Sequence, residues 1–489
     1  MSELSIWQNG QCNIVSFEGQ PVLSDVLSAA GYLVPHPCGG RGTCGKCAVT
    51  LQGAVSAPNE AEQRAGHRLS CQARLLGNAS VILPNTSIAE QIETGIGNIH
   101  TALHPMAGHC GAAVDIGTTT IAVKVYDLAS GACIGEAACR NSQTAVAADV
   151  MGRIDAACRG NGPHLQKLVL QDIDSLLHAA LKDAEPSVKI DSMVLTGNTT
   201  MLYLLNGLDP ESLSHAPFHA EHLFDKDAEI LGRRTYLPPC MSAFVGADIT
   251  CAVLASGMCQ SNETSLLCDI GTNGEIALWK NGKLFVTSTA AGPAFEGAGI
   301  SCGCGSTQGA IDKVWLEEDA LRIHTIGEAD PVGLCGSGLI DAIAVGLKCE
   351  IIDETGALEE DSFPLCDAVH LLPQDIRAVQ LAKAAIAAGI ATLTEAADVS
   401  MEEIQTLYIA GGFGSHLNVE SAADIGLIPN ELKSRVTILG NASLAGAVNA
   451  LLNKNTWKQL RRIASTSQHV NLGGNPKFND YYIEHMMFE

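Results

Sequence analysis

The spacing of apolar residues changes along the chain and separates a short first part from a longer second part. In the first part, short apolar or alternating runs are typical of half-buried strands, and the turn dipeptide Asn9-Gly10 lies between two of them. Residues 21–33 instead carry apolar side chains at helical spacing after a proline. The predicted strands cover residues 4–7, 13–19, 46–53 and 79–84. We therefore expect a small β-rich unit over residues 1–84.

A polar stretch without a regular apolar period, residues 85–110, follows this unit, and we expect it to be a linker with one short helix at 88–95. Buried strands, glycine-containing turns and helices come next. Residues 111–128 have the pattern of a β-hairpin, and residues 265–286 repeat it. An internal duplication of this kind predicts two similar lobes within residues 111–489. Further helices are predicted at 164–182, 372–394 and 441–453.

Composition supports ordered cores and narrows the choice of partners. Of the 489 residues, 46% are apolar and 17% are charged, below the roughly 25% charged content of typical globular proteins. The net charge of −24 argues against nucleic acid as a partner and favours a basic face on a protein. The N-terminal residues lack a targeting pattern, and there is no run of about 18 apolar residues. We therefore expect a cytoplasmic protein without a membrane span.

Cysteines are concentrated near the N-terminus. Cys38, Cys44 and Cys47 have the spacing C-x5-C-x2-C, and Cys71 follows in a separate segment. Three thiolates on one loop and a fourth from elsewhere are the arrangement that a [2Fe–2S] cluster needs. The alternative, structural zinc, usually has two C-x2-C knuckles, and only one is present. Glycines that let the loop curl over a cluster stand at positions 39, 40, 42 and 45.

This N-terminal unit resembles the β-grasp [2Fe–2S] ferredoxins. Its C-x5-C-x2-C spacing is closer to adrenodoxin-like members than to the plant-type C-x4-C-x2-C pattern.

Two turns in the second part have the chemistry of phosphate-binding turns. Asp115 and Asp269 each end a buried strand and are followed by glycine and threonine, whose amides and hydroxyls suit phosphate oxygens. A third loop, Ala410-Gly411-Gly412-Phe413-Gly414, follows a strand and lets a nucleoside lie against the backbone. The candidate nucleotide contacts are Gly117, Thr118, Thr119, Thr120, Gly271, Thr272, Asn273, Gly274, Gly411, Gly412 and Phe413.

Phosphoryl transfer mainly requires positioning and neutralisation of charge, so the carboxylates of these turns are candidates to hold Mg²⁺ or the attacking water. They are Asp115, Asp269 and Glu275, and the sequence leaves open which of them activates water. No P-loop is present, which excludes a Walker-type ATPase at the level of motifs. Hairpin turns that bind nothing are the alternative.

The order of these segments resembles the acetate kinase, sugar kinase, Hsp70 and actin superfamily (ASKHA). The resemblance implies a fold class of α+β and α/β: a β-grasp ferredoxin domain followed by a duplicated, ribonuclease H-like ATPase domain that binds ATP and Mg²⁺.

The whole chain resembles the reductive activators of corrinoid-dependent enzymes. The resemblance rests on the motifs above and on further segments such as VLTGNTTM, which contains Asn198, and AAGPAFEGAGISCG. It implies that Asn198 contacts the nucleotide. The further matching segments are residues 194–201, 243–255, 290–303, 333–344, 375–390, 411–418, 439–447 and 478–488.

This resemblance implies an enzyme that uses ATP to deliver one electron through its [2Fe–2S] cluster and reduces inactive cob(II)alamin to cob(I)alamin. The implied partners are a corrinoid protein or corrinoid-dependent methyltransferase component and an upstream low-potential electron donor, with a homodimer left open. The chain departs from some relatives because only the linker separates the two domains, and because no cysteine follows Cys366 to hold C-terminal [4Fe–4S] clusters.

Two other functions fit the same motifs. A small-molecule kinase with a redox-sensing ferredoxin domain would turn over ATP with a small acceptor, and a nucleotide-regulated adaptor would bind ATP without hydrolysis. Two features also stay open. Cys302 and Cys304 are either a metal or redox pair or reduced thiols beside the nucleotide, and Glu296 either contacts a ligand or serves as a cap or salt-bridge partner.

Overall fold

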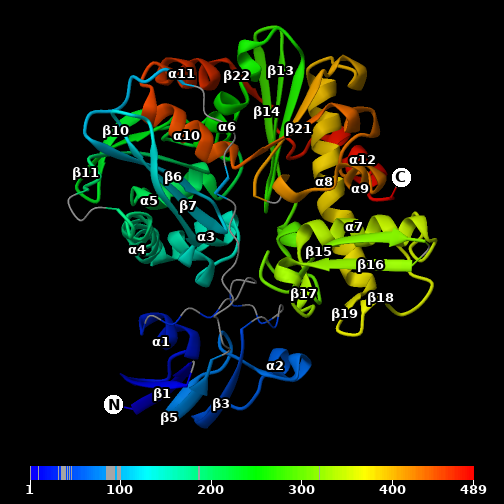
Figure 1. Ribbon diagram of the computed structural model, residues 1–489. Helices are drawn as coiled ribbons and strands as arrows, with labels where there is room; N and C mark the ends of the chain where they lie inside the picture. Colours follow the sequence, from blue (N-terminus) through cyan, green and yellow to red (C-terminus); the bar gives the residue numbers. More distant parts are fainter. Residues whose placement is uncertain are drawn as a thin grey trace.

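The computed structural model shows a small N-terminal unit and two larger lobes. In Figure 1 the N-terminal unit, in blue, lies below the two lobes, which stand side by side. The structure describes residues 2–8, 10–30, 32, 34, 40, 42, 45, 47–83, 94–95, 101–184, 188–318, 320–412 and 414–488.

The N-terminal unit is a five-stranded sheet with two short helices. Its elements are β1 (Ser2–Gln8), β2 (Gln11–Phe17), α1 (Leu23–Ala29), β3 (Ala48–Val55), α2 (Glu60–Ala65), β4 (Arg68–Leu69) and β5 (Leu75–Ile82). The strand order is β2-β1-β5-β3-β4, and β1 pairs with β5 in parallel. Leu4 and Ile6 of β1 are fully buried together with Leu23 and Leu27 of α1. The alternation of β1 and the helical spacing of α1 therefore build one core.

The two lobes are built on sheets of the same topology. The first contains β6 (Cys110–Ile116), β7 (Thr120–Asp127), β8 (Cys133–Arg140), β9 (Ser192–Gly197), β10 (Lys226–Ile230) and β11 (Arg233–Leu237). The second contains β12 (Ser265–Ile270), β13 (Gly274–Lys280), β14 (Lys283–Thr289), β20 (Thr406–Ala410), β21 (Val436–Gly440) and β22 (Ser467–His469).

Each of these sheets contains an antiparallel meander of three strands, β6-β7-β8 or β12-β13-β14. The first strand of each meander also pairs in parallel with a later strand, β9 or β20, and that strand pairs in parallel with another, β11 or β21. The predicted duplication is confirmed by this shared topology.

Two helices fill the space between the sheets. The helices α6 (Ala247–Ser256) and α10 (Ala442–Leu452) pack on each other, and their buried side chains share one core with residues of both sheets. A Cβ atom on Gly446 would lie 2.1 Å from the carbonyl oxygen of Cys251, so the crossing requires glycine at position 446. Both helices begin at the cleft between the lobes, where Asp248 and Asn441 lie.

Other helices cover the outer faces of the sheets. The long helix α4 packs on β7 and β8, and α8 packs on β13 and β14. The helices of the two lobes other than α6 and α10 are α3 (Val150–Ala156), α4 (Gly162–Ala180), α5 (Thr199–Leu205), α7 (Gly336–Lys348), α8 (Pro373–Ala396), α9 (Val419–Asp424), α11 (Thr456–Thr466) and α12 (Pro476–Glu484). The second lobe also carries two small sheets, formed by β15 (Ala310–Glu317), β16 (Ala320–Thr325), β17 (Gly333–Leu334), β18 (Phe363–Cys366) and β19 (Val369–Leu371).

Among the described helices, α8 is long and apolar enough to cross a membrane by length and composition. Of its most apolar window, 78% is buried inside the protein, as in the core helix of a globular domain.

The helices predicted at 164–182, 372–394 and 441–453 match α4, α8 and α10 within two residues at each end. The helix predicted at 21–33 is shorter, because α1 ends at Ala29 and Gly31 is a poor helix former. Asn9 and most of the short helix expected at 88–95 lie outside the described residues.

Candidate functional site

A cleft of about 560 Å³ lies between the two lobes, and both predicted phosphate turns open into it. The predicted residues that line it are Asp115, Gly117, Thr118, Thr119, Thr120, Asn198, Asp269, Gly271, Thr272, Asn273, Glu275, Gly411 and Gly412. Residues from four separate parts of the chain therefore meet at one place. The cleft is also lined by residues that sequence reasoning did not assign to it, including Arg140, Asp248, His416 and Asn441.

Carboxylates of both lobes form the floor of the cleft. Asp115 is near the end of β6 and Asp269 near the end of β12, so the repeated hairpins present equivalent acids from the two sheets. Asn441, the N-cap of α10, donates from Nδ2 to Oδ2 of Asp115 at 3.1 Å and orients that carboxylate. Gly411 lies so close that a Cβ there would be 2.6 Å from Oδ1 of Asp269. The glycine loop and the second phosphate turn are thus in direct contact.

Asp248 is the acid that the sequence analysis missed. It lies in the first turn of α6, and its backbone carbonyl accepts a hydrogen bond from the Ser443 hydroxyl of α10 at 3.1 Å. A carboxylate at the start of a helix following Gly246 was a signal available in the sequence, but nothing local places it beside the two phosphate turns.

These acids resist ionisation because they are buried beside one another. Burial raises the pKa of Asp115 to about 7, with the Asn441 hydrogen bond opposing and the Asp269 charge adding to the shift. Burial also raises the pKa of Asp269 to about 6. The pKa values of Asp248 and Glu275 are raised by burial first and by the neighbouring carboxylates second.

The first phosphate turn is held from behind by two buried polar side chains. Asn141 donates from Nδ2 to the carbonyl oxygen of Gly117 at 2.8 Å. The fully buried guanidinium of Arg153 donates to the carbonyl oxygen of Thr118 and, at 3.1 Å, to Oε1 of Gln143. Burial lowers the pKa of Arg153, and nearby acids oppose this. The turn is therefore preorganised with its hydroxyls toward the cleft.

Some predicted contacts have a different role in the structure. Gly274 begins β13 and packs against Ile386 of α8, behind the turn rather than in the cleft. Asn198 lines the cleft, but its side-chain oxygen caps α5 by accepting from the Thr200 amide at 2.9 Å. Phe413 lies outside the described residues.

The charge of the cleft is unbalanced. Among its described lining residues, Arg140 and His416 are the basic side chains, whereas five carry carboxylates. A nucleoside triphosphate is itself strongly anionic, so its binding here needs added positive charge. No group of three metal-ligating side chains is preformed in the described part of the chain. The arrangement fits a Mg²⁺ held mostly by water and phosphate oxygens, as this ion prefers.

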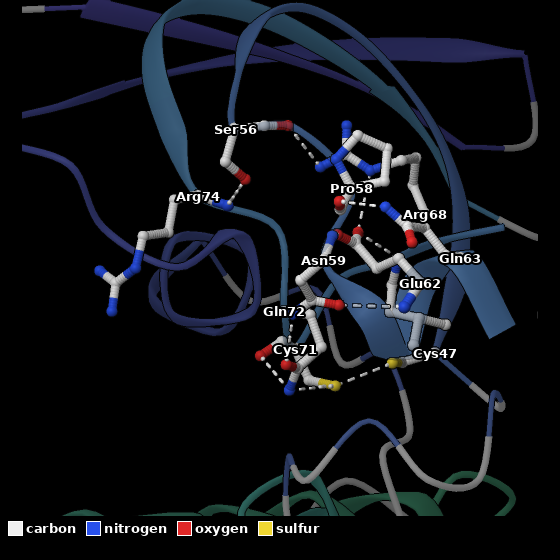
Figure 2. A network of polar contacts seen from close by, with 11 residues as sticks. Cys47, Ser56, Pro58, Asn59, Glu62, Gln63, Arg68, Cys71, Gln72 and Arg74 are labelled. Carbon is white, nitrogen blue, oxygen red and sulfur yellow. Dashed lines mark hydrogen bonds and ion pairs between the residues drawn. The ribbon is translucent and has the colours of Figure 1, made fainter. Parts of the chain in front are cut away.

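The second candidate site lies in the N-terminal unit (Figure 2). The sulfur atoms of Cys47 and Cys71 face each other at 3.3 Å without a disulfide bond between them. The side-chain nitrogen Nε2 of Gln72 donates to the Cys71 sulfur at 3.6 Å and to the carbonyl oxygen of Gly40. Asn59 fixes this orientation by donating to Oε1 of Gln72 at 2.9 Å. Convergent thiols with an amide donor fit a cluster; Cys38 and Cys44 lie outside the described residues.

Cysteines outside the N-terminal unit also lie at the cleft. Cys304 and Cys335 line it, and the Cys335 sulfur lies 3.4 Å from the Ser337 hydroxyl oxygen. Cys302 does not line the cleft, and the alternatives of a metal or redox pair and of reduced thiols beside the nucleotide stay open for Cys302 and Cys304.

The raised pKa values predict how the stability of the nucleotide-free, magnesium-free protein changes with pH. Between the ordinary aspartate pKa of about 4 and the raised folded values, the folded state binds more protons than the unfolded state, so the free energy of unfolding falls as pH rises from 5 to 8. Asp248→Asn mimics the protonated acid. We expect it to increase stability at pH 8 by about 1–2 kcal/mol more than at pH 5, measured by urea unfolding.

The exposed residue Asp330 offers a matched control, and Asp330→Asn should run parallel to the wild type at all pH values. If the free energies of unfolding of Asp248→Asn and the wild type differed by the same amount from pH 5 to pH 8, Asp248 would not be one of the acids whose pKa is raised in the folded cleft.

Family models match both the N-terminal unit and the two lobes. A family model for the 2Fe-2S iron-sulfur cluster binding domain matches residues 7–76. A model described as the RACo middle region matches residues 110–261, and one described as the C-terminal domain of RACo, the ASKHA domain, matches residues 263–489.

Individual relatives span most of the chain. The chain is 34% identical over 422 residues to the corrinoid activation enzyme RamQ of Eubacterium limosum, covering 77% of this chain and 70% of that protein. It is 25% identical over 414 residues to the [Co(II) methylated amine-specific corrinoid protein] reductase of Methanosarcina barkeri, covering 76% of each. A solved structure, the reductive activator for corrinoid, iron-sulfur protein, superposes with a TM-score of 0.74 and 27% identity over 99% of this chain and 98% of that chain. These matches show that the protein belongs to the family of reductive activators of corrinoid proteins, enzymes that join a [2Fe–2S] domain to an ASKHA domain.

Proposed function

We propose that this protein reduces the cobalt of a corrinoid protein by one electron, from cob(II)alamin to cob(I)alamin, and that ATP drives the step. The observation that carries the proposal is the presence, in one chain, of a thiol pair suited to a [2Fe–2S] cluster and an acidic two-lobed cleft suited to a Mg-nucleotide. The working division of the chain is residues 1–84 for the ferredoxin unit, 85–110 for the linker and 111–489 for the ATPase.

Cys38, Cys44, Cys47 and Cys71 are the proposed cluster ligands. The cluster supplies a carrier that accepts and donates one electron at a time. Cys47 and Cys71 already converge, and Gln72 directs an amide donor at one of the two sulfurs. The protein's part is to hold the thiolates and to stabilise their negative charge by this hydrogen bond.

The ATPase proposal assigns a role to each part of the cleft. The hydroxyls and amides of residues 117–120 and 271–273 contact phosphates, and the loop containing Gly411 and Gly412 supports the nucleoside. Asp115, Asp269 and Asp248 would hold a hydrated Mg²⁺, which would offset the negative charge of the phosphates. Glu275, whose pKa is raised and which receives a long 3.4 Å hydrogen bond from Ser288, is the candidate to accept a proton from the attacking water.

ATP is needed because reduction to cob(I)alamin is uphill. For a one-electron step, each 59 mV or so of unfavourable potential is a factor of ten in the equilibrium constant. A nucleotide can offset this only by binding more tightly to one conformation or complex than to another. Mg-ATP would supply such a difference if it bound more tightly when Asp115 and Asp269, which come from different lobes, could both act on the cation.

The proposed partners follow from the family and from charge. The electron acceptor is a corrinoid protein or a corrinoid-dependent methyltransferase component, and an upstream low-potential donor reloads the cluster. The net charge of −24 favours a partner with a basic face. We further propose a cytoplasmic location, and a homodimer as the assembly to test first by light scattering.

The test is an anaerobic assay of cob(II)alamin reduction with titanium(III) citrate as the electron source. The acceptor is cob(II)alamin bound to a corrinoid protein. We expect cob(I)alamin to form with ATP and to form much more slowly without it. We also expect the reduced protein to show the electron paramagnetic resonance signal of a [2Fe–2S] cluster. Equal rates with and without ATP, or the absence of that signal in the reduced protein, would overturn the proposal.

Two variants separate the halves of this function. Cys44→Ser should remove the cluster signal and leave nucleotide binding within about twofold of the wild type, because the ligand lies in the separate N-terminal unit. Asp269→Ala should retain the cluster and lose ATP hydrolysis by about a hundredfold or more, since it removes one acid of the proposed Mg²⁺ site. Cluster spectroscopy and phosphate release measure the two effects.

The exposed residues Cys12 and Asp330 provide matched controls, and Cys12→Ser and Asp330→Ala should leave both measurements unchanged. Unaltered turnover in Asp269→Ala would refute its role, and a joint loss of both properties in Cys44→Ser would show that the domains do not act separately.

Gln72 should tune the cluster. Its amide donor stabilises the more negative, reduced cluster, so Gln72→Leu should lower the midpoint potential. A hydrogen bond worth about 1 kcal/mol corresponds to about 40 mV for one electron. A potentiometric titration followed by electron paramagnetic resonance measures the shift. The exposed neighbour Gln63, which donates to the Pro58 carbonyl oxygen, gives the control Gln63→Leu (Figure 2); equal potentials in the two variants would remove Gln72 from this role.

A further inference from the structure

One carboxylate bridges the two phosphate turns across the cleft. Oε2 of Glu296 accepts a hydrogen bond from the Thr119 hydroxyl at 2.5 Å, and Oε1 accepts one from the Thr272 hydroxyl at 2.8 Å. Thr119 belongs to the first turn and Thr272 to the second, so the contact joins the two lobes. Glu296 itself comes from the short 3-10 turn Pro293–Glu296 that follows β14.

These two hydroxyls are also the ones proposed to bind phosphate. A threonine hydroxyl has a single proton to donate. Neither Thr119 nor Thr272 can therefore donate to Glu296 and to a phosphate oxygen at the same time. A phosphate that accepts from both hydroxyls must displace the carboxylate, and a phosphate that leaves allows the carboxylate to return.

The turn that carries Glu296 is firmly anchored. Phe295 is 2% exposed and belongs to the main core of the second lobe. The amide of Gly292 donates to the carbonyl oxygen of Thr272 at 2.9 Å, which ties the base of the turn to the second phosphate turn. The position of the Glu296 backbone is thus set by the fold, and release of the bridge requires only a rotation of its side chain.

We propose that Glu296 is the residue by which the cleft distinguishes a nucleoside triphosphate from a diphosphate. This inference rests on the proposed function, because it concerns the same nucleotide site. In the diphosphate or nucleotide-free state, the Glu296 carboxylate links the turns through Thr119 and Thr272. The terminal phosphate of a triphosphate takes over both hydroxyls, and the negative charge of Glu296 opposes its entry. Glu296 thereby lowers affinity for the triphosphate while leaving that for the diphosphate almost unchanged.

The test compares two nucleotides on the full-length, cluster-loaded protein under anaerobic conditions. Isothermal titration calorimetry measures the affinity for Mg-ADP and for Mg-adenylyl imidodiphosphate, a triphosphate analogue that is not hydrolysed. We expect Glu296→Gln to increase affinity for the analogue by about tenfold, because it removes a charge and one of the two acceptors, and to change affinity for ADP by less than about twofold. Glu317→Gln, which removes an exposed carboxylate paired with Arg322 in the same lobe, is the control and should alter neither.

A second variant keeps the inference testable if Glu296→Gln folds poorly. Glu296→Asp keeps the charge but is too short to span both hydroxyls, and it too should improve binding of the analogue more than that of ADP. Equal changes for the two nucleotides, no change, or weaker binding of the analogue would overturn the inference. If the wild-type protein binds neither nucleotide, both the proposed ATPase activity and the role of Glu296 are wrong. If the wild type binds both nucleotides but the variants change the two affinities equally, only the role of Glu296 is wrong.

Discussion

Carboxylates of like charge meet at the floor of the cleft, and the packing of two helices keeps them there. α6 and α10 cross with their backbones in contact at Gly446 and Cys251, and the start of each helix supplies a residue to that floor. Burial raises the pKa values of Asp115, Asp248 and Asp269, and neighbouring carboxylates add to the shift at Asp115 and Asp248. The hydrated Mg²⁺ proposed above would offset the charge of these carboxylates when they ionise.

Two kinds of polar contact hold the phosphate turns above that floor. Asn141 and Arg153 brace the first phosphate turn from behind, so the turn itself is a rigid element. The bridge from Glu296 to Thr119 and Thr272 is in contrast made only of side chains. Contacts made only by side chains can rearrange without movement of the backbone, as the proposed role of Glu296 requires. The N-terminal unit is organised separately, around its own core and its converging thiols.

Much of the fold could be predicted from the chain because its signals are local. The apolar spacing located α4, α8 and α10 closely, and the two aspartate turns revealed the duplication before any contact was known. The same applies to the thiol pattern, since Cys47 and Cys71 do converge. Gly274 shows the limit of such reasoning. Its motif marks it as part of a phosphate turn, but the packing of α8 places it behind the cleft.

By itself the sequence determined the type of chemistry: a thiol cluster site, two aspartate turns and a glycine loop, all encoded within short segments. Only the tertiary structure decided which distant groups act on them. Asn441 contacts Asp115 from 326 residues away, and Glu296 contacts Thr119 from 177 residues away. The positions of Asp248 beside the other cleft acids and of Arg153 behind Thr118 likewise depend on the fold. Spacing along a chain reports which residues share a turn or a helix face, whereas charge, burial and hydrogen bonding depend on neighbours that folding alone brings together.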